Sequence, residues 1–551
     1  MLCRLLALLL VAPCLLNGQA LFAQAPFAQT LSTQVGPSEA LPDPPTMVIA
    51  DSDLLVRWRQ RLEEVVPERG WASRWRLTDL TGEEGPRVYS RWSLSAAGWE
   101  ASLVTERDPG EQDWNDHLVG YVQWQSQAGQ VVVGDLRTGF AQGLLFGRGS
   151  GRGRGRPRRE ANAIGTRSSA ESRSTRGLVL RQERGPWSWA VVAAGFRWDA
   201  RFDSTGAVRS LPDEGIHLGP TAVAGRRRLP GWMMGARLRR QQGSLNMGVS
   251  LQQLRFGKRL ALPSRYGNPL FVGRGQTAGA LDLVWVSGRT RYYIDLVRTP
   301  TAWAGIVGFS GLGPRHLRVS VQARSYSAGF FSPLGAGAHR WQMANEQGVV
   351  FDIRGRGWRG WVDASMRPEP WSIPVQDASS ETGLEGTWRR AGARIYLTVR
   401  QRHDLDWKGG AHWRVARLGR LLGSLTRDRA SLRQRVRVQI QHSRVGRARG
   451  LAMGADGRWQ GARMQTDLQW TLYRIASWAA RVYEYEPGLP GTVMILPLNG
   501  DGWRLNGALR HRWGAWTVAI TARYERRRAT PARSRIGLQI DALSASGQAS
   551  Q

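Results

Sequence analysis

The chain has 551 residues, 42% of them hydrophobic, and a formal net charge of +34 from 77 basic and 43 acidic side chains. Such a charge ordinarily indicates a polyanionic partner such as nucleic acid, lipid phosphate or lipopolysaccharide. Because Lys258 and Lys408 are the only lysines and all other basic residues are arginines, the charge alone does not select among these partners. Both cysteines, Cys3 and Cys14, lie in the first 25 residues, so a chain that loses this segment has no disulfide, thiol nucleophile or cysteine metal site.

The first 25 residues have the pattern of a secretory signal peptide. Arg4 precedes an apolar run at residues 5–16, and small residues follow it at positions suited to cleavage. The run is shorter than a spanning helix needs, and no later stretch reaches about 18 uninterrupted apolar residues. A lipoprotein anchor on Cys14 is less favoured, because Pro13 stands where a small residue is expected. We therefore predict an exported chain without helical membrane spans.

Two short segments separate this signal peptide from the body of the chain. Residues 26–50 are rich in Pro, Ser, Thr and Gln with little periodicity, which predicts a linker. Residues 51–86 are predicted to form a short periplasmic segment, in which residues 52–66 have helical periodicity. This is the one convincing helical pattern in the sequence.

From residue 87 to 543, hydrophobicity alternates with period two in stretches of roughly ten residues separated by turn residues. In the stretch RQRVRVQIQ, Val436, Val438 and Ile440 face one side, while Arg435 and Arg437 face the other. Three further stretches show apolar faces of the same kind: Ile395, Leu397 and Val399; Leu468, Trp470 and Leu472; and Trp516, Val518, Ile520 and Tyr524. Counted generously, the pattern predicts about two dozen strands.

A sheet of this size with no helices to cover it has to close on itself. We therefore predict an all-β fold, a large transmembrane antiparallel β-barrel of about 20–26 strands over residues 87–543, followed by a polar tail at 544–551. The 26 tryptophans, scattered along the chain, suit interfacial girdles. The expected location is the outer membrane of a Gram-negative cell, with outer-membrane lipid, lipopolysaccharide and the barrel insertion machinery as partners. A secreted β-propeller or β-helix is the alternative, but no repeat of fixed period is evident.

The stretch GRGSGRGRGRPRRE, at residues 147–160, lies between predicted strands and is therefore a loop of the barrel domain. Its arginines form a candidate anion-binding loop: Arg148, Arg152, Arg154, Arg156, Arg158 and Arg159. Guanidinium groups suit phosphate oxygens of lipopolysaccharide or an anionic solute. Nucleic-acid binding is weakly supported, because the stretch is short and lacks interleaved aromatic residues. A solvated flexible loop is the simplest interpretation.

No catalytic, cofactor-binding or metal-binding residues are predicted. The acidic stretch at residues 105–116 could supply oxygen ligands to Ca²⁺, but a turn explains it better. The eight histidines form no HxH or HExxH pair, and no GxSxG elbow or phosphate loop occurs. An enzyme is therefore less favoured than a non-enzyme. Charged residues inside predicted strands should face the lumen, the space that the barrel encloses, and pair there: Asp135, Arg137, Asp282, Asp295, Glu484 and Glu486.

Five segments together resemble a family of outer-membrane β-barrel proteins known as helix-hairpin-helix domain proteins, found in Bacteroidota and related phyla. They are WEASLVTERDPGE (99–111), VVVGDLRTGFAQGLLFGRG (131–149), FRWDARF (196–202), NEQGVVFDIRG (345–355) and ARVYEYEPGLPGTVMILPLNGDGWRLNGALR (480–510). The resemblance implies a barrel over most of the mature chain. In that family a DNA-binding helix-hairpin-helix module commonly precedes the barrel. Here no recognisable module of that kind precedes residue 87, and the resemblance implies no catalytic residues.

These observations favour a channel or transport-related barrel with an arginine-rich lumen and anionic ligands. The alternatives are a nucleic-acid-binding or DNA-uptake-associated surface protein, and a lipid-modifying barrel enzyme.

Overall fold

The computed structural model describes residues 70–544, except 83, 112–116, 148–160, 168–173, 213–216, 218, 264–268, 314–315, 370–377, 391–392, 408–412, 430, 444–447 and 529. The predicted signal peptide, linker and helix at 52–66 therefore lie outside the described residues, as does the tail beyond Ser544.

The described chain forms a closed antiparallel barrel of 24 wall strands, within the predicted range. The wall strands in order around the barrel are β1 (Gly70–Thr78), β2 (Arg87–Ala96), β3 (Trp99–Arg107), β4 (His117–Gln125), β5 (Gly129–Gly139), β7 (Thr175–Arg184), β8 (Trp187–Trp198), β11 (Leu229–Gln242), β12 (Leu245–Leu262), β13 (Phe271–Ser287), β14 (Thr290–Arg298), β15 (Trp303–Leu312), β16 (Arg318–Tyr326), β17 (Glu346–Gly355), β18 (Trp358–Met366), β19 (Ala378–Arg390), β20 (Ala393–Trp407), β21 (Trp413–Arg429), β22 (Leu432–Ser443), β23 (Ala448–Gln460), β24 (Met464–Ile475), β27 (Gly500–Trp513), β28 (Trp516–Arg527) and β29 (Thr530–Leu543).

The remaining described elements are short. They are β6 (Ala161–Gly165), β9 (Arg201–Phe202), β10 (Val208–Ser210), α3 (Pro220–Gly225), the 3₁₀ turn η4 (Trp478–Ala480), β25 (Val482–Glu486) and β26 (Met494–Leu498). Among the residues described, no helix is long and apolar enough to cross a membrane.

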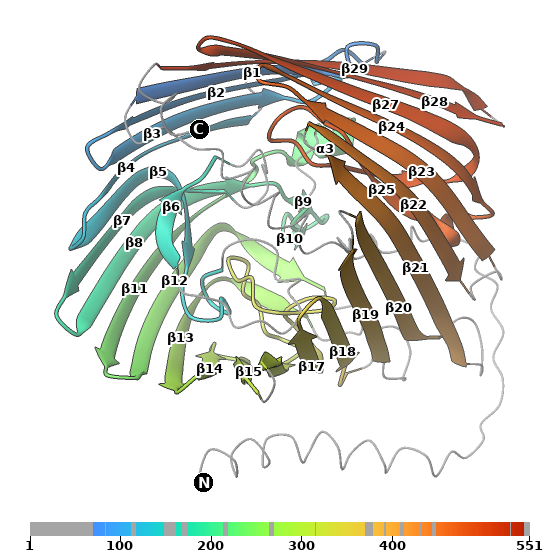
Figure 1. Cartoon of the computed structure of the whole chain (residues 1–551). Coiled ribbons are helices and arrows are strands. Elements are labelled where there is room, and N and C mark those ends of the chain that lie inside the picture. Colours follow the sequence, from blue (N-terminus) through green and yellow to red (C-terminus); the bar gives the residue numbers. More distant parts are fainter. Residues whose placement is uncertain are drawn as a thin grey trace. The chain divides into compact units, whose positions relative to one another are not determined.

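The barrel closes where β1 pairs with β29, which corrects the predicted start at residue 87. The register runs from Ala72 opposite Leu543 to Leu77 opposite Leu538, and blue β1 lies beside red β29 in Figure 1. The segment predicted to be periplasmic thus supplies the first wall strand. Its inward Arg74 donates to Asp541 across the seam, with a nitrogen–oxygen distance of 2.6 Å. This pairing, which depends on a residue far along the chain, is invisible in the local pattern of β1.

The predicted alternation is confirmed, with the apolar face outside. On β22, Val436 and Ile440 are 55% and 43% exposed, whereas Arg437 between them is buried. Leu468, Trp470 and Leu472 of β24, and the apolar residues of β20 and β28 named above, are likewise exposed or half-buried on the outer surface. An apolar outside and a polar inside are what a bilayer-spanning barrel requires.

The two ends of the barrel differ in their connections. At one end, which we call the tight-turn end, many connections are two-residue hairpin turns, and both β1 and β29 have their chain ends there. Gly185, Gly243, Gly288 and Gly514 begin four of these turns with φ between +55° and +58°, a conformation that glycine adopts without strain. At the other end, the loop end, the longest connections are residues 140–174, 199–228, 327–345 and 476–499.

Many of the exposed tryptophans lie at the tight-turn end. Each of seven exposed tryptophans lies on a strand within two residues of a described tight turn or of the barrel's chain start: Trp71, Trp99, Trp187, Trp358, Trp459, Trp513 and Trp516. Amphipathic indole rings concentrate where hydrocarbon meets headgroups. These residues therefore form one interfacial girdle, as the scattered tryptophans predicted.

Placing a charge in the middle of the outer face should destabilise the barrel. Leu505 is exposed near the middle of β27, and we expect Leu505→Arg to lower the free energy of unfolding in vesicles by about 2–4 kcal/mol. His511 lies on the same face nearer the tight-turn end. We expect His511→Arg to change the free energy of unfolding by about 0–1 kcal/mol. Urea unfolding of both variants in lipid vesicles measures the difference. Equal effects at the two depths would contradict a bilayer around this face.

Candidate functional site: the lumen and its folded-in loops

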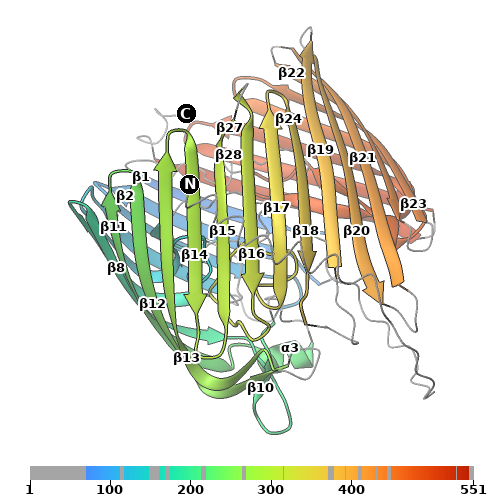
Figure 2. The same ribbon diagram turned by 90° about the horizontal axis from the view of Figure 1, so that it is seen from below.

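Several long connections of the loop end fold back into the lumen or over its opening. Figure 1 shows β6 inside the ring of wall strands, and Figures 1 and 2 together place α3 and β10 over the opening at the loop end. The segment following β5, residues 140–147, is buried and meets the segment 327–345 inside the barrel. We call these two segments the plug.

An apolar core fills the lumen beside β5 and β7–β16. Leu144 and Phe146 of the plug are 0% and 1% exposed. An aromatic chain links the plug to the wall: the Phe331 ring stacks on Phe271 with centroids 4.8 Å apart, and Phe256 lies 6.3 Å from Phe331. Protein interiors packed in this way exclude water. This half of the lumen is therefore closed by a core of the kind found inside soluble domains.

Hydrogen bonds join the two plug segments to each other and to the wall. Ala336 N donates to the Gly143 carbonyl at 2.8 Å, and Gly147 N donates to the Leu334 carbonyl at 2.9 Å. A Cβ on Gly147 would lie 2.2 Å from Ala336 N, so glycine is needed for this approach. On the wall side, the Asp295 carboxylate of β14 accepts Gln142 N at 3.0 Å.

A buried ion pair fixes the end of the second plug segment. Glu346, at the start of β17, is fully buried and accepts a hydrogen bond from Arg324 Nε of β16 at 2.6 Å. Its oxygens also accept the backbone N–H groups of Arg340 and Trp341 at 2.8 and 2.9 Å. The carboxylate thus holds the returning loop against the wall with charge-assisted bonds.

The hairpin β25–β26, residues 482–498, lies against the opposite, polar half of the wall. Glu484 accepts from Arg437 of β22 at 2.8 Å, and Glu486 forms ion pairs with Arg504 of β27 and Arg523 of β28. Burial raises the pKa of the Glu486 carboxyl above its ordinary value, although the two arginines act in the opposite direction. Glutamates on one face of β25 therefore fasten the hairpin to wall arginines.

The structure places the predicted lumen charges in three different settings. Asp282 faces the lumen and pairs with Arg237 at 2.7 Å, as predicted. Asp135 instead lies where β5 bends away from β4, where it accepts Gly120 N at 2.8 Å and pairs with Arg176. Asp295 binds the plug, and Arg137 is half-buried on β5.

Glu484 and Glu486 pair with arginines inside the lumen, as predicted, but they project from the folded-in hairpin and not from a wall strand. The period-two pattern of VYEYE does not distinguish a wall strand from a strand inside the lumen. A strand that lies inside the lumen shows the same period two, because one of its faces packs against the wall.

The described part of the acidic stretch at 105–116 connects loops through ion pairs and hydrogen bonds. Glu106 and Asp108 both pair with Arg87, at 2.6 and 2.7 Å. Glu111 accepts His217 N at 3.1 Å, and the His217 ring contacts Asp199 at 2.8 Å. Within the described part of the chain, no group of His, Cys, Asp and Glu side chains is arranged to hold a metal ion.

All six arginines of the predicted anion-binding loop, Arg148, Arg152, Arg154, Arg156, Arg158 and Arg159, lie outside the described residues. Both flanks of this stretch are described and lie inside the barrel. Gly147 is bonded to the plug, and Arg167 donates to the Tyr121 hydroxyl at 2.6 Å and pairs with Glu100. The anion-binding and nucleic-acid hypotheses for this loop stay predictions.

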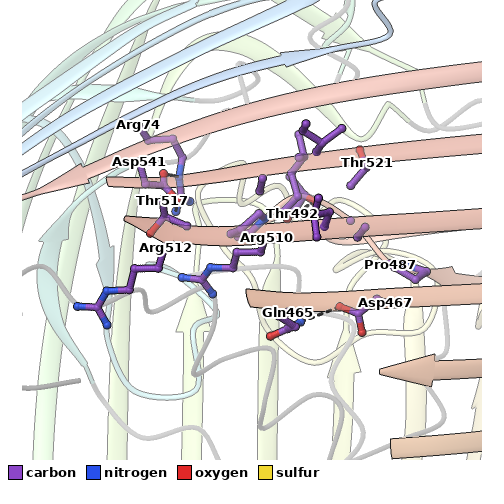
Figure 3. A pocket seen from close by; sticks show the side chains of 18 of the residues that line it. Arg74, Gln465, Asp467, Pro487, Thr492, Arg510, Arg512, Thr517, Thr521 and Asp541 are labelled. Carbon is purple, nitrogen blue, oxygen red and sulfur yellow. Dashed lines mark hydrogen bonds and ion pairs between the residues drawn. The ribbon is translucent and has the colours of Figure 1, made fainter. Parts of the chain in front are cut away.

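A cavity of about 320 Å³ lies between residues 487–493 of the hairpin and strands β1, β24 and β27–β29 (Figure 3). Its charged lining consists of five arginines and two aspartates: Arg74, Arg91, Arg458, Arg510, Arg512, Asp467 and Asp541. Arg74 pairs with Asp541, and Arg458 pairs with Asp467. Arg510 and Arg512 project from β27 in the same direction in Figure 3, and neither guanidinium has a carboxylate partner among the described side chains.

Sequence reasoning did not single out Arg510 and Arg512, although a usable signal was present. The stretch RLNGALRHRW predicts a strand, and period two places Arg504, Arg510 and Arg512 on the same face as the buried Asn506. Which arginines remain without a carboxylate depends on neighbouring strands, which the local pattern does not specify.

Comparison with known proteins finds no matching family model and no matching curated protein. Among solved structures, the chain is similar to the translocation pore of the P pilus usher PapC, with 10% identity over 86% of this chain and 99% of that one and a TM-score of 0.37. It is also similar to the siderophore receptor PirA from Acinetobacter baumannii, with 6% identity, coverage of 88% and 81%, and a TM-score of 0.42. The FrpB iron transporter from Neisseria meningitidis matches with 7% identity, coverage of 88% and 83%, and a TM-score of 0.39. At these identities the similarity concerns the large β-barrel fold alone.

Proposed function

We propose that this protein is an outer-membrane barrel that passes anionic solutes along the polar side of its lumen. In bacterial barrels of even strand number, short turns face the periplasm and longer loops face outwards. The tight-turn end, with both chain ends of the barrel, is accordingly assigned to the periplasm and the loop end to the cell exterior.

The cavity beside the hairpin carries this proposal. Five guanidinium groups against two carboxylates leave its described lining with a net charge of +3. Because Arg510 and Arg512 have no carboxylate partner in the part of the chain described, their charge is available to a passing anion. Rings of basic side chains at such positions give pores anion selectivity, since they attract anions and repel cations.

The rest of the lumen supports a narrow path and not a wide pore. The plug closes the apolar half, and the hairpin covers the cavity from the lumen side. A solute would therefore pass close to the arginines, where low local dielectric strengthens electrostatic discrimination.

Reversal-potential measurements in planar bilayers test this function. Under a KCl gradient we expect the refolded barrel to conduct with an anion preference. The double variant Arg510→Ser/Arg512→Ser should lower the anion-to-cation permeability ratio by roughly threefold or more. Arg298→Ser is the matched control, because Arg298 is exposed on the outer face of β14, and it should leave the ratio unchanged.

Two outcomes would contradict the proposal. Cation preference in the unmodified barrel would exclude an anion path. Absence of conductance from a folded, heat-modifiable barrel would indicate a closed lumen and direct attention to ligand binding at the loops.

A further inference from the structure

A second feature lies on the outer surface of the barrel. Near the loop end, strands β23, β24, β27 and β28 and the start of β29 line a groove of about 920 Å³. Its apolar lining is Leu451, Met453, Leu472, Trp503 and Tyr524, and its basic lining includes Arg474, Arg526 and Arg528. The apolar members other than Trp503 are all exposed on the outer face, so the groove belongs to the surface that meets lipid.

Strand register brings the three arginines together. Arg474 of β24 lies opposite Asp501 of β27, and Arg528 N donates to the Asp501 carbonyl at 2.9 Å on the other side. Arg526 lies opposite Trp503, one row nearer the middle of the barrel. Since neighbouring strands are about 4.8 Å apart, Arg474 and Arg528 flank β27 at a separation of about 10 Å.

Apolar side chains continue directly below this basic patch. Leu472 lies opposite Trp503, and Leu505 lies opposite Tyr524 in the next row. The Trp503 and Tyr524 rings contact each other with centroids 5.2 Å apart. The groove is thus basic towards the loop end and apolar towards the middle of the membrane.

The arginine charges are largely uncompensated. The Arg474 side chain is 84% exposed, and its Asp501 partner is 3.7 Å away. Arg526 and Arg528 are exposed and have no carboxylate partner among the described residues. Arginine facing hydrocarbon is destabilising, so a cluster of three on the outer face belongs at the level of lipid headgroups.

We propose that this groove binds one molecule of the lipid A class, a glycolipid with two phosphates and several acyl chains, in the outer leaflet. The three arginines would bind its phosphates through charge-assisted hydrogen bonds, and the acyl chains would lie over Leu451, Met453 and Leu472. Arginines on both sides of β27 suit a headgroup with two separated phosphates better than a glycerophospholipid with one. The inference uses the orientation assigned above but is independent of anion passage.

Native mass spectrometry of the full refolded barrel in detergent tests this site. Bis-phosphorylated lipid A and dioleoylphosphatidylglycerol serve as the two probes. We expect one copy of lipid A to bind at least about tenfold more tightly than phosphatidylglycerol. The variant Arg474→Gln/Arg526→Gln/Arg528→Gln should weaken this binding about tenfold. The control Arg240→Gln/Arg390→Gln/Arg463→Gln removes three exposed arginines near tight turns and should alter it by less than about twofold.

A gain-of-affinity variant keeps the proposal testable even if the triple variant folds poorly. Asp501→Asn removes the carboxylate that lines the groove among the described residues, and it should tighten lipid A binding about two- to threefold. Equal affinity for both probes, or unchanged lipid A binding in the triple variant, would overturn the proposal. If the unmodified barrel forms a dimer and the triple variant does not, the groove is an interface between two copies of the chain. That result would also overturn the proposal.

Discussion

Replacing residues 476–499 by an Asn-Gly turn is expected to raise single-channel conductance by about threefold or more. Ile475 and Gly500 face each other in the register of β24 and β27, so a two-residue hairpin turn can join them without disturbing the wall. The change removes the hairpin that covers the cavity, together with Glu484 and Glu486. Arg437 keeps Asp456 and Arg504 keeps Glu525, so the wall arginines stay partly compensated.

Anion preference should rise in the same variant, because two carboxylates leave the lumen with only one arginine, Arg481, so that its net charge rises by +1. The control Glu484→Gln/Glu486→Gln keeps the hairpin backbone, and we expect it to increase anion preference with a smaller rise in conductance. Bilayer recordings of both variants under the same salt gradient distinguish the effect of the lost charges from the effect of removing the hairpin as an obstruction. Unchanged conductance in a correctly folded deletion variant would show that the hairpin does not limit the path.

Truncation of Glu346 should strongly destabilise the barrel. Glu346→Ala leaves Arg324 buried with Asp363 and Ser365 as its described side-chain partners, and it removes the acceptor of two plug N–H groups. Breaking a buried pair in this way costs about 3–5 kcal/mol. Guanidinium unfolding of the refolded barrel measures the change in the free energy of unfolding.

The double variant Arg324→Met/Glu346→Leu is the matched control for that experiment. It removes both charges together, so no unpaired ion remains, and we expect a smaller loss than in Glu346→Ala. A loss below about 1 kcal/mol in the single variant would contradict a structural role for this ion pair.

Period-two alternation predicted the wall well because each wall strand meets lipid on one side. Val436 and Ile440 face outwards, and Arg437 faces inwards, as the stretch RQRVRVQIQ indicated. On strands such as β22 and β24, the contrast between hydrocarbon and a polar interior lies within the strand itself, so the signal is local. Even the number of strands follows from it, apart from β1, whose partner strand lies at the other end of the barrel.

The contents of the lumen were not predictable in the same way. The segment GFAQGLLFGRG resembles a loop by its glycines, yet Leu144 and Phe146 are buried against residues almost two hundred positions later in the chain. Likewise, the sequence around Glu111 indicates a turn but not its contact with His217. Loops that fold inwards are held by contacts between distant segments, and neither composition nor period specifies such partners.

The β1–β29 seam has a consequence for how the barrel is assembled. The Arg74–Asp541 pair joins residues 467 positions apart, so the ring cannot close until the last strand has been made and delivered. Loop-closure entropy makes contacts at such separation late and slow to form. Until then, β1 and β29 each present an unpaired edge, on which a helper protein or another unfinished copy can add a strand. The seam is therefore the point at which assembly is expected to be slowest and most in need of assistance.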